Sequence, residues 1–188
     1  SQGLLTGVSP MPNDKLRYEW KSYYPIAYYL ISISVADYQE YNIWAHPENM
    51  DDSLLIQNFI YDHPDFLGDW KLGIDNTIDF IELFSELYGP YPFPDEKYGH
   101  CVSEIGGGME HQTMTTLTVF NYGLVAHELG HMWFGDNITC ATWNDIWVNE
   151  GFATYSDYLA HHFLTTPYYD SLWLKIRHDH VKSQPDGS

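Results

Sequence analysis

Two histidines and two glutamates have the residue types and the spacing of a metal site. His127 and His131 lie four residues apart in the stretch VAHELGHMW, Glu128 lies between them, and Glu150 follows His131 after 18 intervening residues. On a helix, residues four apart share a face, so both imidazoles would point the same way. Two neutral imidazoles and a carboxylate suit zinc, and a site with three protein ligands keeps its fourth position for water, as catalytic zinc sites do.

Apolar residues surround these side chains, which predicts that the site is buried. The neighbours are Ala126, Leu129, Met132, Trp133 and Phe134 for the histidine pair, and Ile146, Trp147, Val148 and Phe152 for Glu150. Buried polar groups need partners, and one shared metal ion would satisfy all of them. The alternative is an amphipathic helix whose histidines face solvent.

Hydrolysis is the chemistry that such a site supports. Zinc lowers the pKa of a bound water toward neutrality, and Glu128 is placed to accept its proton. The resulting nucleophile would attack a polarised carbonyl, for which peptide hydrolysis is the natural use. We therefore predict one zinc ion as the cofactor and Glu128 as the general base.

Two helices must position these side chains. Asn121 is predicted to cap a helix that carries both histidines and ends near Gly135. A second helix, predicted over residues 144–163, carries Glu150. A third, amphipathic helix is predicted over residues 69–88, because apolar residues recur there at helical intervals.

The other segments are interpreted from composition and alternation. Residues 1–20 are polar with Gly, Pro and Asn and predict loops, whereas residues 31–35 alternate Ile or Val with Ser and predict a half-buried strand. Residues 46–66 are acidic with prolines and predict a linker or a short helix. Residues 97–120 contain three consecutive glycines among β-formers, which predicts strands around a close backbone approach. The tail from residue 178 predicts a frayed end.

Composition argues against some classes of function. The 188 residues include 26 acidic and 8 basic side chains, and the formal charge of −18 argues against nucleic-acid binding because it repels phosphate backbones. No apolar run is long enough to span a bilayer. The low lysine content and two cysteines favour an exported protein. Cys101 and Cys140 could form one disulfide or remain two thiols.

Two motifs together resemble those of peptidase family M1, the gluzincin zinc aminopeptidases. The first is HELGH followed after 18 residues by Glu150 within WVNEGFA. The second is GGGMEH, at residues 106–111, which resembles the family's Gly-x-Met-Glu-Asn exopeptidase motif and ends 16 residues before His127. The stretches YPFP and WFGD are also similar to the family. The likeness covers roughly residues 20–165.

The resemblance implies a fold and a set of roles. The implied fold is α+β, a thermolysin-like zincin catalytic lobe with a mixed sheet and two zinc-bearing helices, preceded by a short β segment. The zinc ligands would be His127, His131 and Glu150. Glu110 would bind the free α-ammonium of a peptide substrate and so place the first peptide bond over the metal. The rest of the implied substrate-binding stretch is Gly107, Gly108, Met109 and His111.

The sequence also departs from the family pattern. His111 stands where the family usually has Asn, and the family's catalytic tyrosine falls farther beyond Glu150 than these 188 residues reach. Residues 1–45 resemble only the closing strands of an N-terminal β-domain, and residues 46–188 resemble a catalytic domain truncated at its C-terminal side. We therefore expect a fragment that lacks the parent's N-terminal β-domain and C-terminal helical lobe and is nearly inactive in isolation.

Other functions stay open at this stage. A thermolysin-like endopeptidase would not need Glu110, and the double glycine before Met109 is also found in the family's leukotriene epoxide hydrolase branch. A peptide-binding module that keeps its metal but performs no catalysis is the alternative from another class. Asp157 could support a zinc-binding histidine or be a plain surface carboxylate.

Overall fold

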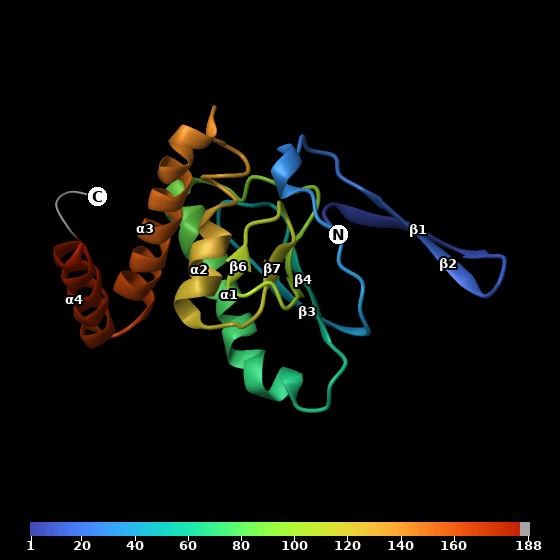
Figure 1. The fold of residues 1–188 in the computed structure, drawn as a ribbon, viewed down its shortest axis with the longest axis horizontal. Helices are drawn as coiled ribbons and strands as arrows, with labels where there is room; N and C mark the ends of the chain where they lie inside the picture. The colour runs from blue at the N-terminus through green and yellow to red at the C-terminus, as the bar shows by residue number, and fades with distance from the viewer. Residues whose placement is uncertain (185–188) are drawn as a thin grey trace.

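The computed structural model describes residues 1–184 as a mixed α and β structure (Figure 1). The strands are β1 Leu4–Met11, β2 Lys15–Lys21, β3 Tyr38–Ala45, β4 Leu54–Tyr61, β5 Tyr98–Val102, β6 Gly108–Met109 and β7 Thr115–Leu117. The helices are α1 Phe66–Tyr88, α2 Tyr122–Gly130, α3 Ile146–Leu164 and α4 Pro167–Ser183, with short 3₁₀ turns at Tyr28–Leu30 and Trp143–Asp145.

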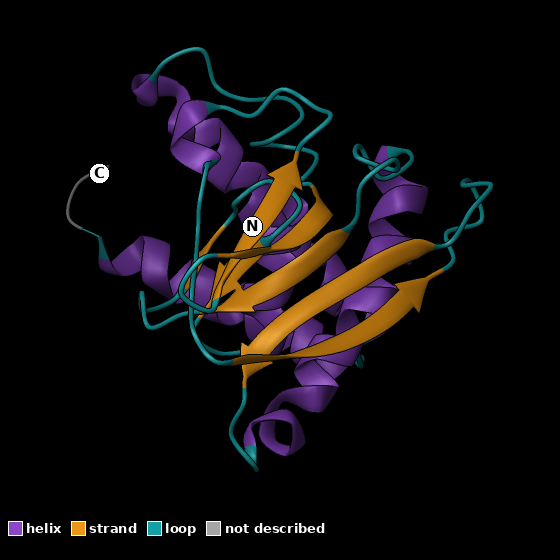
Figure 2. Ribbon diagram, turned by 90° about the vertical axis from the view of Figure 1, so that its right-hand side faces the viewer, coloured by secondary structure: helices purple, strands orange, loops and turns teal. Residues whose placement is uncertain are grey.

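A five-stranded mixed sheet in the order β3-β4-β5-β7-β6 forms the centre of the fold. Strand β5 runs parallel to both of its neighbours, while the outer pairs β3-β4 and β6-β7 are antiparallel. Figure 2 shows the strands in front of the helices, which cover the far face of the sheet. Helix α2 lies between this sheet and α3, and α4 lies outermost (Figure 1). The predicted α+β class with a mixed sheet is confirmed.

Helix α1 supplies much of the core beneath the sheet. Its buried face includes Ile74, Phe80, Ile81 and Phe84, the helical spacing that predicted it. The helix ends at Gly89, which adopts a φ of 101° and donates its N–H to the Ser85 carbonyl. A residue with a Cβ rarely adopts this φ, so glycine suits the stop.

Strand β4 lies inside the segment that was predicted to be a linker or short helix, and that prediction is wrong. Leu54, Ile56, Asn58 and Ile60 alternate as its buried face. The polar Asn58 obscures the period of two, but its amide is satisfied. Nδ2 donates to the Tyr41 carbonyl at 2.7 Å, and Oδ1 lies 2.7 Å from Nδ1 of His100 on β5. A paired polar residue can therefore occupy a core position of a strand.

The predictions of loops over residues 1–20 and of a strand over residues 31–35 are also wrong. Residues 4–21 form the β1-β2 hairpin, whose tip contains Asn13 and Asp14 at positive φ, a conformation that these two residue types tolerate. Residues 31–35 form no strand, and Ile33 and Val35 are 80% and 89% exposed. Their alternation has no neighbouring strand to pair with, so it buries nothing.

The predicted frayed end is helical through Ser183, because α4 packs on α3. Trp173 of α4 donates its indole N–H to Asp157 of α3 at 2.6 Å, and Arg177 reaches the same carboxylate oxygen. Asp157 is buried, so it is not a surface carboxylate, and its side-chain hydrogen bonds among the described residues go to α4 and not to His127 or His131. Residues 185–188 of the tail lie outside the described residues.

A glycine lets helices α2 and α3 approach closely. A Cβ added to Gly130 would lie 2.7 Å from both Cβ and Oγ of Ser156. We expect Gly130→Ala to lower the free energy of unfolding by about 1–3 kcal/mol, because it overpacks this crossing. Gly151→Ala on α3, where a Cβ would meet nothing within 4 Å, is the control and should stabilise the helix. Urea unfolding measures both; equal effects would contradict the packing argument.

Candidate metal centre and substrate site

Helix α2 begins as the sequence predicted but ends earlier. Asn121 caps it, with Oδ1 accepting the Leu124 N–H at 3.0 Å. The helix ends at Gly130 and not near Gly135, because the chain reverses there: the Asp136 N–H donates to the His131 carbonyl at 3.0 Å. His131 is therefore the C-terminal cap of α2, and its side chain still lies on the face that carries His127.

Three ligand atoms converge between α2 and α3. Oε2 of Glu150 lies 3.2 Å from Nε2 of His127 and 3.7 Å from Nε2 of His131, and the two imidazole nitrogens are 3.3 Å apart. A tetrahedral zinc site with bonds of about 2.0–2.1 Å has ligand–ligand edges of roughly 3.3 Å. The observed triangle therefore has the size and the donor atoms that fit zinc.

The orientation of the His131 ring supports the same interpretation. Its Nδ1 lies 3.2 Å from the Phe134 carbonyl oxygen, which can only accept a hydrogen bond. Nδ1 must therefore carry the proton in the neutral ring, which leaves the Nε2 lone pair free to face His127 and Glu150. Metal-binding histidines are commonly held by such a bond from the other ring nitrogen.

The burial that the sequence predicted holds for only part of the site. The side chain of His131 is 1% exposed and that of His127 is 22% exposed, whereas Glu150 is 51% exposed. The argument that Glu150 is buried is wrong, since Trp147 on the preceding turn is itself 70% exposed. The buried face of α3 includes Asn149, Ala153 and Ser156, and Glu150 lies at its margin. Without a metal, hydrogen bonds from His127 and then from a doubly protonated His131 hold the pKa of Glu150 below its usual range.

Glu128 lies against the sheet edge next to the ligand triangle. It is 5% exposed, and burial raises the pKa of its carboxyl to about 8, with the Glu110 and Glu150 carboxylates adding to the rise and His131 opposing it. A Cβ added to Gly108 of β6 would lie 2.6 Å from Cδ of Glu128. Glycine at this position therefore makes room for the carboxylate, whose Oε2 has no hydrogen-bond partner among the described residues.

Glu110 faces the same point from the end of β6. Its carboxylate, that of Glu128 and an imidazole nitrogen of His131 all lie within 4.8 Å of one another. Glu110 is 5% exposed, so this carboxylate is presented in a confined space. A group with hydrogen-bond donors and positive charge is the ligand that such a pair of buried carboxylates would attract.

The neighbours of Glu110 lie along the β6 edge. Gly106 and Gly107 adopt φ values of 76° and 89° with open space around them, and Met109 pairs with Thr116 of β7. His111 is partly buried, which lowers its pKa, and its Nδ1 lies 2.8 Å from Oγ1 of Thr116. Residues 106–109 are therefore exposed or partly exposed and lead to the buried Glu110.

Lys97 is a buried charged residue near the site that the sequence reasoning missed. It is 0% exposed, and its Nζ donates to the Thr113 carbonyl at 3.0 Å. Burial lowers its pKa to about 7, although Glu96 opposes this shift. The only sequence signal was a lysine directly before the apolar start of β5.

The buried lysine predicts a pH dependence of stability. The folded pKa lies below the ordinary value of about 10.5, so between pH 7 and 10 the unfolded chain binds more protons and the free energy of unfolding rises with pH. The rise should be at most about 1.4 kcal/mol per pH unit. Urea unfolding from pH 7 to 9 should show it for the native chain and not for Lys97→Met. Parallel profiles for the two chains would contradict the assignment.

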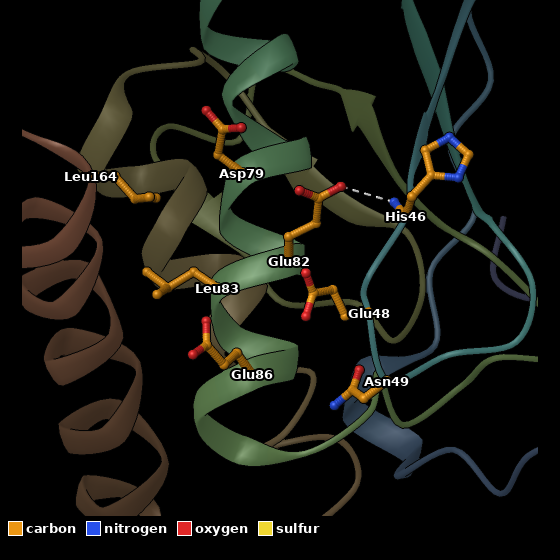
Figure 3. Close-up of a pocket in the computed structure, with 8 residues that line it drawn as sticks. All are labelled: His46, Glu48, Asn49, Asp79, Glu82, Leu83, Glu86 and Leu164. Carbon is orange, nitrogen blue, oxygen red and sulfur yellow. Dashed lines mark hydrogen bonds between the residues drawn. The ribbon is translucent and has the colours of Figure 1, made fainter.

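A separate acidic cavity of about 600 Å³ lies along α1 (Figure 3). Its lining comprises His46, Glu48, Asn49, Asp79, Glu82, Leu83, Glu86 and Leu164. Within residues 1–184, the groups of ligand atoms close enough to share a metal ion are the two described above, and neither includes these residues. The cavity is therefore assigned no ligand. Cys101 and Cys140 are both free thiols, so the disulfide alternative is not realised.

Comparison with known proteins decides the family. The model of the peptidase family M1 domain matches residues 72–185. The chain belongs to peptidase family M1. This M1 chain is 31% identical over 147 residues to aminopeptidase N of Mus musculus, an alignment that covers 69% of the chain and 14% of that protein. It is 29% identical over 166 residues to leucine aminopeptidase 2 of Aspergillus fumigatus, and this alignment covers 82% of the chain and 25% of that protein.

Solved structures show the same fold. A two-domain M1 zinc metallopeptidase bound to L-tryptophan superposes with a TM-score of 0.81 at 22% identity, covering 98% of this chain and 41% of that one. The M1 zinc metallopeptidase from Deinococcus radiodurans superposes with a TM-score of 0.79 at 22% identity, covering 98% of this chain and 42% of that one. The M1 chain thus spans under half of these structures and at most a quarter of the two curated relatives. Among residues 1–184, no helix combines the length and the apolar character needed to cross a bilayer.

Proposed function

We propose that this M1 chain carries the catalytic centre of a zinc aminopeptidase, which removes N-terminal residues from peptides that have a free α-amino group. The observation that carries the proposal is the convergence of two residue groups on His131. One group is the ligand triangle with His127 and Glu150, and the other pairs His131 with the buried Glu110 and Glu128. The names of the relatives, aminopeptidase N and leucine aminopeptidase 2, support the same activity.

The residues of the chain divide the chemistry among them. Zinc, when held by His127, His131 and Glu150, supplies a Lewis acid that polarises a carbonyl and lowers the pKa of water. Glu128, whose Oε2 has no hydrogen-bond partner among the described residues, accepts a proton from the attacking water and can return it to the leaving amine. Glu110 binds the ammonium of the substrate and so sets which peptide bond is positioned for attack.

Backbone groups along β6 complete the proposed substrate site. Gly107 and Gly108 have little side-chain bulk to block an extended peptide, which could pair with this edge of the sheet. Met109 and His111 flank Glu110 and would line the same path. The division of the chain into an N-terminal segment over residues 1–45 and a catalytic part over residues 46–188 stays a prediction, as does the low activity of the isolated chain.

Cleavage of free and blocked substrates by Glu110 variants tests the proposal. In the zinc-loaded chain, Glu110→Ala should lower the hydrolysis of an L-leucyl arylamide by about tenfold or more, because the ammonium loses its charged partner, and should spare the N-acetylated arylamide. Glu104→Ala, at an exposed position before β6, is the matched control. Undiminished hydrolysis of both substrates in Glu110→Ala would favour the endopeptidase alternative, which does not need Glu110. Zinc binding without cleavage of either substrate would favour a peptide-binding module.

A further inference from the structure

Two consecutive turns fix the backbone at Glu110. The His111 N–H donates to the Met109 carbonyl at 2.9 Å, so Glu110 is the central residue of a tight three-residue turn. The Met114 N–H then donates to the His111 carbonyl at 2.9 Å, which closes a four-residue turn. The two turns share His111, so the second turn adjoins the backbone that carries the Glu110 carboxylate.

The second turn contains a strained residue. Thr113 adopts a φ of 62°, a left-handed conformation that is an outlier for a β-branched side chain. Such a conformation persists only where the surrounding structure holds it, and these residues cluster at functional sites. Within residues 1–184, the other non-glycine residues with positive φ are Asn13 and Asp14, whose side chains tolerate it.

Thr113 is held by partners from three parts of the chain. Its carbonyl accepts the bond from Lys97, and its N–H donates to Sδ of Met132, next to His131, at 3.4 Å. Its Oγ1 accepts the Gly3 N–H at 3.2 Å and donates to the Glu96 carboxylate at 3.4 Å. One donor in this set is the buried amino group of Lys97, whose Nζ reaches no other acceptor at hydrogen-bond distance among the described residues.

We propose that Lys97 is a positioning residue for the ammonium site: by holding the carbonyl of Thr113 it fixes the strained turn and thereby the place of Glu110 relative to His131. The inference rests on the proposed role of Glu110. A buried lysine is costly, and an apolar side chain of similar length would fill the same space. Such a side chain would leave the Thr113 carbonyl without its partner and would remove the contact that offsets the strain at Thr113.

The test measures binding and does not depend on turnover. The zinc-loaded chain is titrated calorimetrically with L-leucine hydroxamate and with N-acetyl-L-leucine hydroxamate, and the ratio of the two affinities reports the ammonium contribution. We expect a ratio of about ten or more for the native chain and near one for Glu110→Gln. Lys97→Met should lower the ratio at least threefold with unchanged zinc content, whereas Lys71→Met, at an exposed lysine of α1, should leave it unchanged.

A second background separates positioning from a general loss of structure. Glycine adopts positive φ without strain, so in Thr113→Gly the turn does not depend on the bond from Lys97. In that background, Lys97→Met should lower the affinity ratio by less than half as much as it does in the native chain. If Lys97→Met alone does not fold, the same substitution in the Thr113→Gly background should lower the ratio less than threefold, and a larger drop would contradict the positioning role. A native ratio above ten that Lys97→Met leaves unchanged would overturn the role of Lys97 alone. A native ratio near one would overturn the role of Glu110 and, with it, that of Lys97.

Discussion

Removal of zinc with a chelator is expected to lower the free energy of unfolding of the chain by about 4 kcal/mol. This value refers to a zinc-loaded sample in which free zinc is about 1,000 times the dissociation constant of the site. The ligands come from two separate helices, α2 and α3, and meet only in the folded chain. Zinc bound there stabilises the native state and not the unfolded one. Thermal unfolding with zinc and after dialysis against EDTA measures the difference.

Substitution of one ligand separates this site from incidental metal binding. Glu150→Gln keeps the shape of the side chain but removes the charge, and the affinity for zinc should fall at least about 100-fold, since even outer partners of zinc ligands contribute about 10- to 100-fold. Glu86→Gln, in the acidic cavity along α1, is the control and should leave zinc binding unchanged. If EDTA destabilised the native chain and Glu150→Gln equally, the metal would lie elsewhere.

The arrangement of the metal-ligand residues could be predicted from the sequence because it depends on local geometry. Two histidines four apart on a capped helix share a face wherever that helix packs. The second helix was likewise expected, and it begins at Ile146, within two residues of the predicted start. The exposure of Glu150 could not be predicted, because it depends on how wide a face α3 presents to α2.

The sheet and the support of Glu110 were harder to predict for a different reason. Asn58 occupies a core position of β4 because Tyr41 and His100, on the two neighbouring strands, satisfy its amide. Lys97 and Thr113 lie 16 residues apart and meet only after β5 and β7 have paired. These contacts are products of tertiary structure, and a pattern of single residues along the chain carries no trace of them. Residues 31–35 show the opposite case. Their alternating pattern is typical of a strand, but no neighbouring strand pairs with them and no strand forms.

Glu128→Gln is expected to remove nearly all hydrolysis of an L-leucyl arylamide by the zinc-loaded chain, a loss of about 10²- to 10⁴-fold, because an amide cannot accept the proton of the attacking water. The low activity predicted for the isolated 188-residue chain would narrow the range over which such a loss can be measured. The loss must therefore be measured against a zinc-free blank.

Binding distinguishes the loss of a proton acceptor from the loss of the site. The glutamine side chain has nearly the same shape and can occupy the same space against Gly108, so zinc content and the affinity for L-leucine hydroxamate should stay within about threefold of the native chain. Glu104→Gln is the matched control for turnover. Retained hydrolysis in Glu128→Gln, with zinc bound, would show that another group takes the proton. In that case Glu110 is the residue to substitute next. Among the described residues, its carboxylate is the only other one within 4.8 Å of both the Glu128 carboxylate and an imidazole nitrogen of His131.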